Sequence, residues 1–162
     1  MTETPAKNAA KVIGVISDTH GLVRPEALQA LQGVDLLIHA GDIGSPEVLA
    51  CLGSIACVAA VRGNIDRDCW ARAIPEERFA PVGRSRIYVL HDVNQMRLNP
   101  VLEGIHVVIS GHSHRPSITE KNGVVYFNPG SAGPRRFKLP VAVGRMEFRG
   151  AHVKSEIIEL SI

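Results

Sequence analysis

Five short aliphatic runs, each too short for a buried helix, place the strongest constraint on how this chain can fold. They are residues 11–17, 34–39, 56–61, 86–90 and 106–110. Runs of this length that are apolar on both faces are typical of buried strands, as in parallel sheets. Because aromatic residues make up only 4% of the chain, the core must be filled mainly with valine, isoleucine, leucine and alanine.

Helical segments are expected between the first three runs. Pro25 begins a helix that ends near Gly33, and Ser45 is the expected N-cap of a second helix that begins at Pro46. Proline is favoured in the first helical turn, serine at the N-cap and glycine after the last turn. The order strand, helix, strand, helix, strand implies parallel strands with right-handed crossovers.

The second half of the chain changes to short strands joined by turns. Asn122-Gly123 and Arg149-Gly150 each separate two segments with strand character. Asn-Gly in this setting is the strongest short-range signal for a β-hairpin. Residues 92–104 are polar and contain Pro100, so any helix there is short or broken. We expect an α/β fold in which two mixed β-sheets pack as a sandwich flanked by helices.

Length and composition limit the class of protein. The chain has 162 residues, a hydrophobic fraction of 45% and a net charge of +2. These values argue against a disordered chain and against a strongly basic nucleic-acid-binding module. No apolar run reaches the roughly 18 residues that span a bilayer, and the polar N-terminus does not resemble a signal peptide. We expect a cytoplasmic protein with no membrane association, a disordered lead-in at residues 1–10 and one domain at residues 11–162.

The three cysteines, Cys51, Cys57 and Cys69, fit neither a disulfide framework nor a zinc site. Their number is odd, and their spacing matches no zinc template. Because Cys51 and Cys57 lie among apolar residues in the sequence, we predict that both are buried, reduced thiols.

Each of the five runs ends in residues that can bind a metal ion. These residues are Asp18 and His20, then Asp42, then Asn64, then His91, and finally His112 and His114. The carboxyl ends of parallel strands meet at one edge of a sheet, and ligands bind there in open α/β folds. Seven oxygen and nitrogen donors without cysteine suit two divalent ions that share a carboxylate and keep positions open for water.

This ordered set resembles the calcineurin-like metallophosphoesterase superfamily. The matching motifs are Asp18-x-His20, Gly41-Asp42, Gly63-Asn64, His91 and Gly111-His112-Ser113-His114, together with Asn128-Pro129-Gly130-Ser131, which is typical of its small bacterial and archaeal phosphodiesterases. The resemblance runs from about Val12 to Phe148. It implies a divalent-metal-dependent phosphoesterase that hydrolyses phosphodiester bonds, with phosphomonoester bonds as a second expected substrate, by in-line attack of a metal-bridging hydroxide.

The resemblance also implies a role for each ligand. Asp18, His20 and His114 would bind the first metal ion, Asn64, His91 and His112 the second, and Asp42 both. Asp42, Asn64 and His91 are the expected catalytic residues. Manganese is the first expectation for both ions, with iron, zinc, cobalt or nickel as alternatives. Two such cations lower the pKa of a shared water and offset charge on the phosphoryl group.

Two positions depart from the family's pattern. Many relatives carry a histidine where this chain has Ile65, and that histidine can protonate the leaving group. Without it, esters with a leaving group of low pKa should react much faster than alkyl esters. Asp92 stands where relatives commonly have glycine. It either hydrogen-bonds a ligand imidazole or bound water, or is a solvated loop carboxylate.

Several residues near the ligands have supporting roles to be assigned. Arg62 and Arg115 flank ligands directly and are the expected substrate-binding residues, because the arginine fork donates two hydrogen bonds to phosphate. Arg67, Arg135 and Arg136 are further candidates. His39 is either a buried core histidine or a residue that orients Asp42, and Asp66 is expected to be a structural loop residue.

The expected partner is a small phosphoester substrate, with no specific nucleic acid. The alternative function is a non-catalytic protein-interaction scaffold of the same fold, as in the eukaryotic retromer subunit. The complete set of seven donors favours catalysis. The net charge of +2 and the lack of a capping domain argue against a nuclease. The sequence leaves open the natural substrate and whether the chain forms a homo-oligomer.

Overall fold

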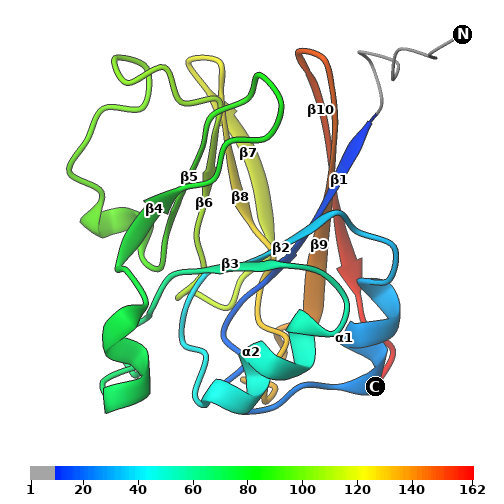
Figure 1. Cartoon of the computed structure of the whole chain (residues 1–162). Coiled ribbons are helices and arrows are strands. Elements are labelled where there is room, and N and C mark those ends of the chain that lie inside the picture. The colour runs from blue at the N-terminus through cyan, green and yellow to red at the C-terminus, as the bar shows by residue number, and fades with distance from the viewer. Residues whose placement is uncertain (1–9) are drawn as a thin grey trace, which may run out of the picture.

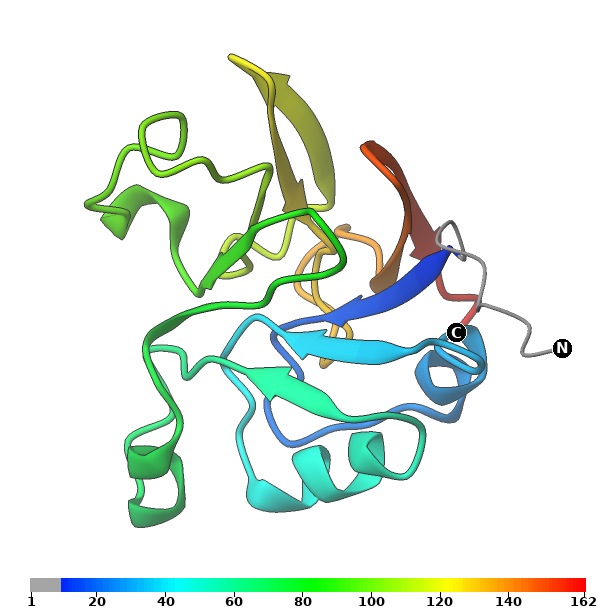
Figure 2. The ribbon, with the colours of Figure 1, turned by 45° about the horizontal axis from the view of Figure 1, so that its top comes forward.

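Two five-stranded β-sheets packed face to face form the framework of the computed structural model, which describes residues 10–162 (Figure 1, Figure 2). One sheet has the strand order β10-β9-β1-β2-β3, and the other has the order β4-β5-β6-β8-β7. Both contain parallel and antiparallel pairs, so the predicted sandwich of two mixed sheets is confirmed. The lead-in expected at residues 1–10 lies, apart from Ala10, outside the described residues.

The first sheet combines three parallel strands with a hairpin. Its strands are β1 (Lys11–Ile16), β2 (Leu36–His39), β3 (Val58–Ala60), β9 (Ala142–Arg149) and β10 (His152–Glu159). The predicted second hairpin is present, although its turn is Gly150-Ala151, one residue later than expected. The antiparallel pairing of β9 with β1 closes the parallel part of this sheet on one side.

Two helices cover the outer face of the first sheet, as Figure 2 shows. They are α1 (Pro25–Ala30) and α2 (Pro46–Gly53). Each has proline in its first turn, as predicted. Ser45 occupies the N-cap of α2, but its side chain makes no capping hydrogen bond with a described residue. Within residues 10–162, no helix is long and apolar enough to cross a membrane.

The second sheet contains three parallel strands between two antiparallel edges. Its strands are β4 (Glu77–Phe79), β5 (Ile87–Leu90), β6 (Val107–Ile109), β7 (Ser117–Lys121) and β8 (Val124–Asn128). Asn122-Gly123 forms the turn between β7 and β8, as predicted. The residue pattern did not predict β4 or the 3₁₀-helix η1 (Cys69–Ala73), because both are short and contain an arginine.

Aliphatic side chains fill the space between the sheets. Val15 and Ile38 from the first sheet pack in one buried cluster with Val89, Ile109 and Phe127 from the second. Among residues 10–162, no α-helix lies over the outer face of the second sheet. An irregular segment that includes the 3₁₀-helix η2 (Val93–Gln95) covers it instead, in agreement with the short or broken helix expected there.

The prediction of two buried cysteines is wrong. Cys51 is only half-buried and Cys57 is exposed, and all three cysteines are free thiols. Cys57 directly precedes β3, which is an edge strand, so its apolar sequence neighbours do not enclose it. Apolar neighbours along the chain therefore do not establish burial when the strand lies at the edge of a sheet.

Candidate metal centre

The predicted ligands come together at the edge of the sandwich where the parallel strands end. They follow β1 (Asp18 and His20), β2 (Asp42), β3 (Asn64), β5 (His91) and β6 (His112 and His114). Two groups of potential ligand atoms each lie within 4.8 Å of one another: Asp18, His20 and His114 in one, and Asp18, Asp42 and His91 in the other. The sheet topology thus joins strand ends that are far apart in the sequence.

Asp18 is a fully buried carboxylate in which one oxygen accepts hydrogen bonds and the other accepts none from the described residues. Its Oδ2 accepts hydrogen bonds from Oγ of Ser17 at 2.7 Å and from the backbone N–H of His112 at 3.1 Å. Its Oδ1 accepts none from any described residue and lies 3.3 Å from Nε2 of His114. A buried carboxylate oxygen without a donor is unfavourable unless a cation meets its charge.

Asp42 repeats this arrangement at the end of β2. Its Oδ1 accepts a hydrogen bond from the backbone N–H of Ile65 at 3.1 Å. Its Oδ2 lies 3.3 Å from Nε2 of His91 and 3.8 Å from Nε2 of His20. Asp42 therefore stands between histidines of the two groups, as a bridging ligand must. Asp18 has a similar place, because its Oδ1 also lies 3.8 Å from Nε2 of His91.

The backbone sets the tautomer of His91. Its Nδ1 lies 2.7 Å from the carbonyl oxygen of Ala40, which can only accept, so Nδ1 carries a proton and Nε2 faces Asp42. Burial lowers the pKa of His91, but the hydrogen bond to Asp42 and the charges of Asp18 and Asp42 outweigh burial and raise this pKa. Protons therefore compete with a metal ion for Nε2.

The remaining charges in the cluster also favour a cation. Burial is the largest influence on His20 and lowers its pKa, so the imidazole is neutral. The buried Nε2 of His20 has no hydrogen-bond partner among the described residues. Burial raises the pKa of Asp18 and of Asp42, but contacts with the histidines outweigh it and lower both. Ionised carboxylates and a neutral imidazole with unpaired atoms fit divalent cations.

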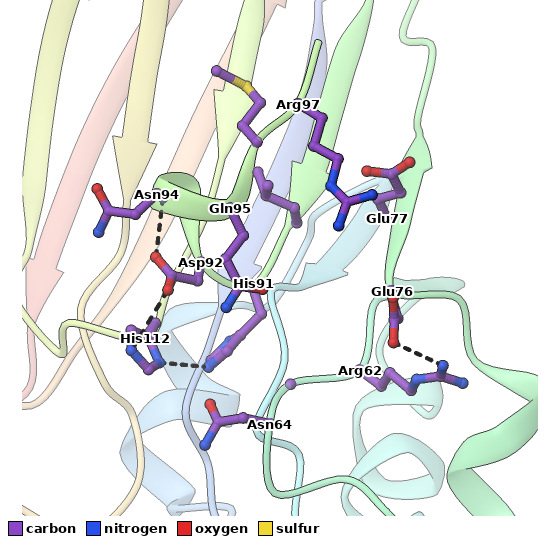
Figure 3. Close-up of a pocket in the computed structure, with 13 residues that line it drawn as sticks. Arg62, Asn64, Glu76, Glu77, His91, Asp92, Asn94, Gln95, Arg97 and His112 are labelled. Atoms are coloured by element: carbon purple, nitrogen blue, oxygen red, sulfur yellow. Dashed lines mark hydrogen bonds and ion pairs between the residues drawn. The ribbon is translucent and has the colours of Figure 1, made fainter.

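Asn64 and His112 lie on the open side of the cluster, beside a cavity of about 690 Å³ (Figure 3). Nδ1 of His112 lies 3.3 Å from Nε2 of His91, and its side chain is 46% exposed. Asp92 lies 3.8 Å from Nε2 of His112, and it also accepts a hydrogen bond from the N–H of Asn94. Asp92 is thus a partly buried carboxylate beside the imidazole of His112, at a distance longer than a hydrogen bond.

His39 is fully buried beneath the Asp42 loop and holds that loop from both sides. Its Nδ1 accepts from the N–H of Gly41 at 3.1 Å, so its Nε2 carries the proton and donates to Oγ1 of Thr19 at 2.9 Å. The Thr19 hydroxyl in turn donates to the carbonyl of Ile43 at 2.8 Å. His39 is therefore a buried core histidine that also positions the residues on either side of Asp42.

Asp66 joins the loop after β2 to the loop after β3. Its carboxylate accepts hydrogen bonds from the N–H groups of Ile43 and Gly44 at 3.0 Å and from that of Gly63 at 2.8 Å. Asp66 thus has the structural role expected of a loop residue.

The Asn128–Ser131 segment supports the cluster from the second sheet. The Asn128 side chain donates to the carbonyl of Gly111 at 2.9 Å, and Oγ of Ser131 donates to the carbonyl of Asp18 at 3.0 Å. Both residues are buried, so this motif holds the strand ends in place.

Five of the seven predicted ligands have a left-handed backbone. They are Asp18, His20, Asp42, His112 and His114, with φ values of 55°, 47°, 53°, 69° and 60°. Each such conformation costs about 1–2 kcal/mol in a residue other than glycine. Only two other non-glycine residues in the described part of the chain share it. Strain concentrated in this way is typical of functional sites.

Of the two arginines expected to bind substrate, Arg62 lines the cavity and Arg115 does not. The guanidinium of Arg62 donates to Glu76 at 3.0 Å and to the carbonyl of Ile74 at 3.3 Å, at the edge of the cavity (Figure 3). Arg115 is exposed and lies outside the set of residues that line this cavity. Their binding role stays a prediction. Arg97 lines the cavity but was not singled out, because nothing in its polar segment distinguishes it.

Two glycines allow the close approach of the ligand loops. A Cβ at Gly63 would lie 2.1 Å from Oδ1 of Asp42. A Cβ at Gly111 would lie 2.0 Å from Oγ of Ser17 and 2.6 Å from Oδ2 of Asp18. These distances explain why glycine precedes Asn64 and His112.

The variant Gly111→Ala is expected to be less stable by about 1–3 kcal/mol and to bind manganese more weakly, because the added methyl group displaces Ser17 and Asp18. Urea denaturation and manganese titration measure the two effects. Gly53→Ala is the matched control, since a Cβ there meets nothing within 4 Å, and its stability should change by less than about 1 kcal/mol. Equal behaviour of the two variants would contradict the close-packing argument.

His39 is expected to make folding stability depend on pH. Burial lowers the pKa of His39 to about 4, while the unfolded chain takes up this proton near pH 6.5. The free energy of unfolding should therefore fall as the pH drops from 6.5 towards 4. Between pH 7 and pH 5, metal-free protein should lose about 2 kcal/mol more than His39→Asn in urea denaturation. The same pH dependence in both proteins would show that His39 does not act in this way.

Comparison with known sequences agrees with the geometry of the cluster. The sequence model of the calcineurin-like phosphoesterase superfamily domain matches residues 12–150. A probable metallophosphoesterase of Methanothermobacter thermautotrophicus is 37% identical, over 91% of each chain. A phosphodiesterase of Methanocaldococcus jannaschii is 29% identical, over 73% of this chain and 82% of the relative.

Solved structures share the fold. An archaeal phosphodiesterase superimposes with a TM-score of 0.74 at 22% identity, over 91% of this chain and 99% of the other. Vps29 of Chaetomium thermophilum gives 0.75 at 19% identity, over 93% and 98%. Calcineurin-like phosphoesterases use divalent metals, and two candidate ligand groups are present here. On its sequence match and its fold, this chain belongs to the calcineurin-like phosphoesterase superfamily.

Proposed function

We propose that this protein hydrolyses phosphodiester bonds with two divalent metal ions, manganese first among them. The observation that carries the proposal is the pair of buried carboxylates. Asp18 and Asp42 each have one oxygen held by a backbone N–H and the other turned towards imidazole nitrogens. The similarity to a phosphodiesterase of Methanocaldococcus jannaschii supports the reaction class.

We assign the metal ligands as the sequence analysis predicts. Asp18, His20 and His114 hold one ion, Asn64, His91 and His112 hold the other, and Asp42 is shared. When bound, the ions supply a water of lowered pKa as nucleophile and offset charge on the phosphoryl group. The chain orients His91 through Ala40 and places Asn64 and His112 at the cavity, the side from which a phosphoester can approach.

The fold does not distinguish hydrolysis from the alternative scaffold function, because a phosphodiesterase and Vps29 both have this fold. The complete donor set favours hydrolysis over a purely structural surface. Metal-dependent turnover of a panel of phosphomonoesters, phosphodiesters and cyclic nucleotides distinguishes the two functions. Turnover of none of these compounds with any divalent metal would favour the scaffold.

Elemental analysis after reconstitution with manganese is expected to find two ions per chain. Asp42→Asn should lower this number and reduce kcat/KM for bis(nitrophenyl) phosphate by about 100-fold or more, because one negative charge between the two histidines is removed. Asp68→Asn changes an exposed carboxyl group and serves as the control. One ion or none in the unmodified protein would count against the assignment.

The rate of hydrolysis is expected to depend steeply on the pKa of the leaving group. Ile65 is 43% exposed and cannot transfer a proton. Aryl diesters should therefore react much faster than alkyl diesters, and Ile65→His should narrow the gap, since a placed acid contributes roughly 10²–10⁴-fold. Ile65→Gln is the control, because it is polar but not an acid. Equal rates for both diester classes, with chemistry rate-limiting, would refute the missing-acid interpretation.

A further inference from the structure

A basic loop with an exposed aromatic ring lies at the end of the sandwich that carries the predicted metal ligands. The basic loop is residues 134–138, with the sequence Pro-Arg-Arg-Phe-Lys, and every one of these residues is exposed. It belongs to the connection between β8 and β9, which Figure 1 shows at the end of the sheets where β1 and β2 terminate. None of its side chains has a role in the metal centre described above.

Hydrogen bonds fix the two residues that directly precede the basic loop against the Asp18 strand end. The N–H of Ala132 donates to the carbonyl of Ser17 at 3.0 Å, and Arg24 donates to the carbonyl of Gly133 at 3.2 Å. A Cβ on Gly133 would lie 2.4 Å from the carbonyl oxygen of Asp18, so the two segments are in direct contact. The basic loop therefore begins beside the residues of the first predicted ligand group.

The three cations of the loop have no ionic partner in the part of the chain that the structure describes. Arg135, Arg136 and Lys138 form no ion pair with any residue in the range 10–162. Arg62, by contrast, is paired with Glu76. Three unpaired positive charges within four residues, next to a predicted phosphate site, attract polyanions such as a chain of phosphodiesters.

The side chain of Phe137 lies outside the hydrophobic core. Its side chain is 94% exposed, whereas Phe127 and Phe148 are 1% and 4% exposed in the core. Its φ of 53° is a left-handed conformation that a bulky residue rarely adopts. An exposed ring between cations is the combination with which proteins bind single-stranded nucleotides, since bases stack on the ring and phosphates meet the cations.

We propose that the basic loop binds short single-stranded oligonucleotides, with a base stacked on Phe137 and a phosphate beside the scissile one held by Arg135 and Arg136. The inference rests on the proposed phosphodiesterase function and gives that site its substrate class. The net charge of +2 argues against an extended groove, but one base and one further phosphate require no such groove. A membrane surface also accepts basic and aromatic residues. The hydrogen bonds that hold Ala132 and Gly133, directly before the loop, beside the Asp18 strand end favour a substrate instead.

A titration with an oligonucleotide tests directly whether the basic loop binds single-stranded nucleic acid. A fluorescently labelled hexanucleotide with phosphorothioate linkages is titrated with manganese-loaded protein and followed by anisotropy. Phe137→Ala should raise Kd by roughly 10-fold, within the range measured for loss of one stacked base. Joint replacement by Arg135→Gln and Arg136→Gln should lower the slope of log Kd against log salt by about 0.7 for each phosphate that the loop no longer neutralises.

Matched controls lie at the opposite end of the sheets. Leu102→Ala removes another exposed apolar side chain, 82% exposed, just before β6. Arg84→Gln removes an exposed cation just before β5. Both controls should keep the Kd of the unmodified protein, and circular dichroism confirms that all variants are folded. A Kd that rises equally in controls and loop variants would overturn the proposal.

Measurements of catalysis distinguish the proposed role of the basic loop from the proposed phosphodiesterase function. The ratio of kcat/KM for a trinucleotide to that for methyl nitrophenyl phosphate should fall roughly 10-fold in Phe137→Ala. If the small diester is hydrolysed but neither this ratio nor the hexanucleotide Kd changes, the loop proposal is overturned and the proposed function stands. If no diester is hydrolysed, the proposed function fails, and the hexanucleotide titration still decides the loop. Binding to phosphatidylglycerol vesicles that Phe137→Ala abolishes, with an unchanged hexanucleotide Kd, would overturn the proposal in favour of a membrane surface.

Discussion

Backbone N–H groups from neighbouring loops hold the two buried carboxylates, and the arrangement of the candidate site depends on these hydrogen bonds. Asp18 at the end of β1 accepts from His112 after β6, and Asp42 at the end of β2 accepts from Ile65 after β3. Each bond uses one carboxylate oxygen and leaves the other facing imidazole nitrogens. The close approach that these bonds need is possible because Gly111 and its counterpart before Asn64 have no side chain.

The same arrangement makes the metal-free cluster unfavourable in itself. A buried oxygen of Asp18 has no donor among the described residues, and five predicted ligands have a left-handed backbone. Burial lowers the pKa of His91, but its contacts with Asp18 and Asp42 outweigh burial and raise this pKa. The aliphatic core between the sheets and the network around His39 and Asp66 keep these groups in place. A cation that binds only the folded chain stabilises the fold by mass action, so a metal ion held at this edge would couple its binding to folding.

The surroundings of the cluster differ on its two sides. Beside Asn64 and His112, the cavity is lined by both acidic and basic side chains, and Arg62 is already paired with Glu76. Beside the end of β1, Ala132 and Gly133 lead into the basic loop, whose cations have no ionic partners among the described residues. Fold alone does not assign a function, and the chemistry that selects a substrate lies in these flanking segments.

The residue pattern predicted the buried strands and the gathering of Asp18, Asp42 and His91, because short apolar runs in parallel order must end at one edge. It could not predict that Arg62 pairs with Glu76, that Cys57 is exposed at an edge strand, or that β4 exists. These features depend on which segments meet after the chain has folded. Periodicity reports the neighbours of a residue along one strand, whereas pairing, exposure and the left-handed backbone of the ligands are set by contacts between strands distant in sequence.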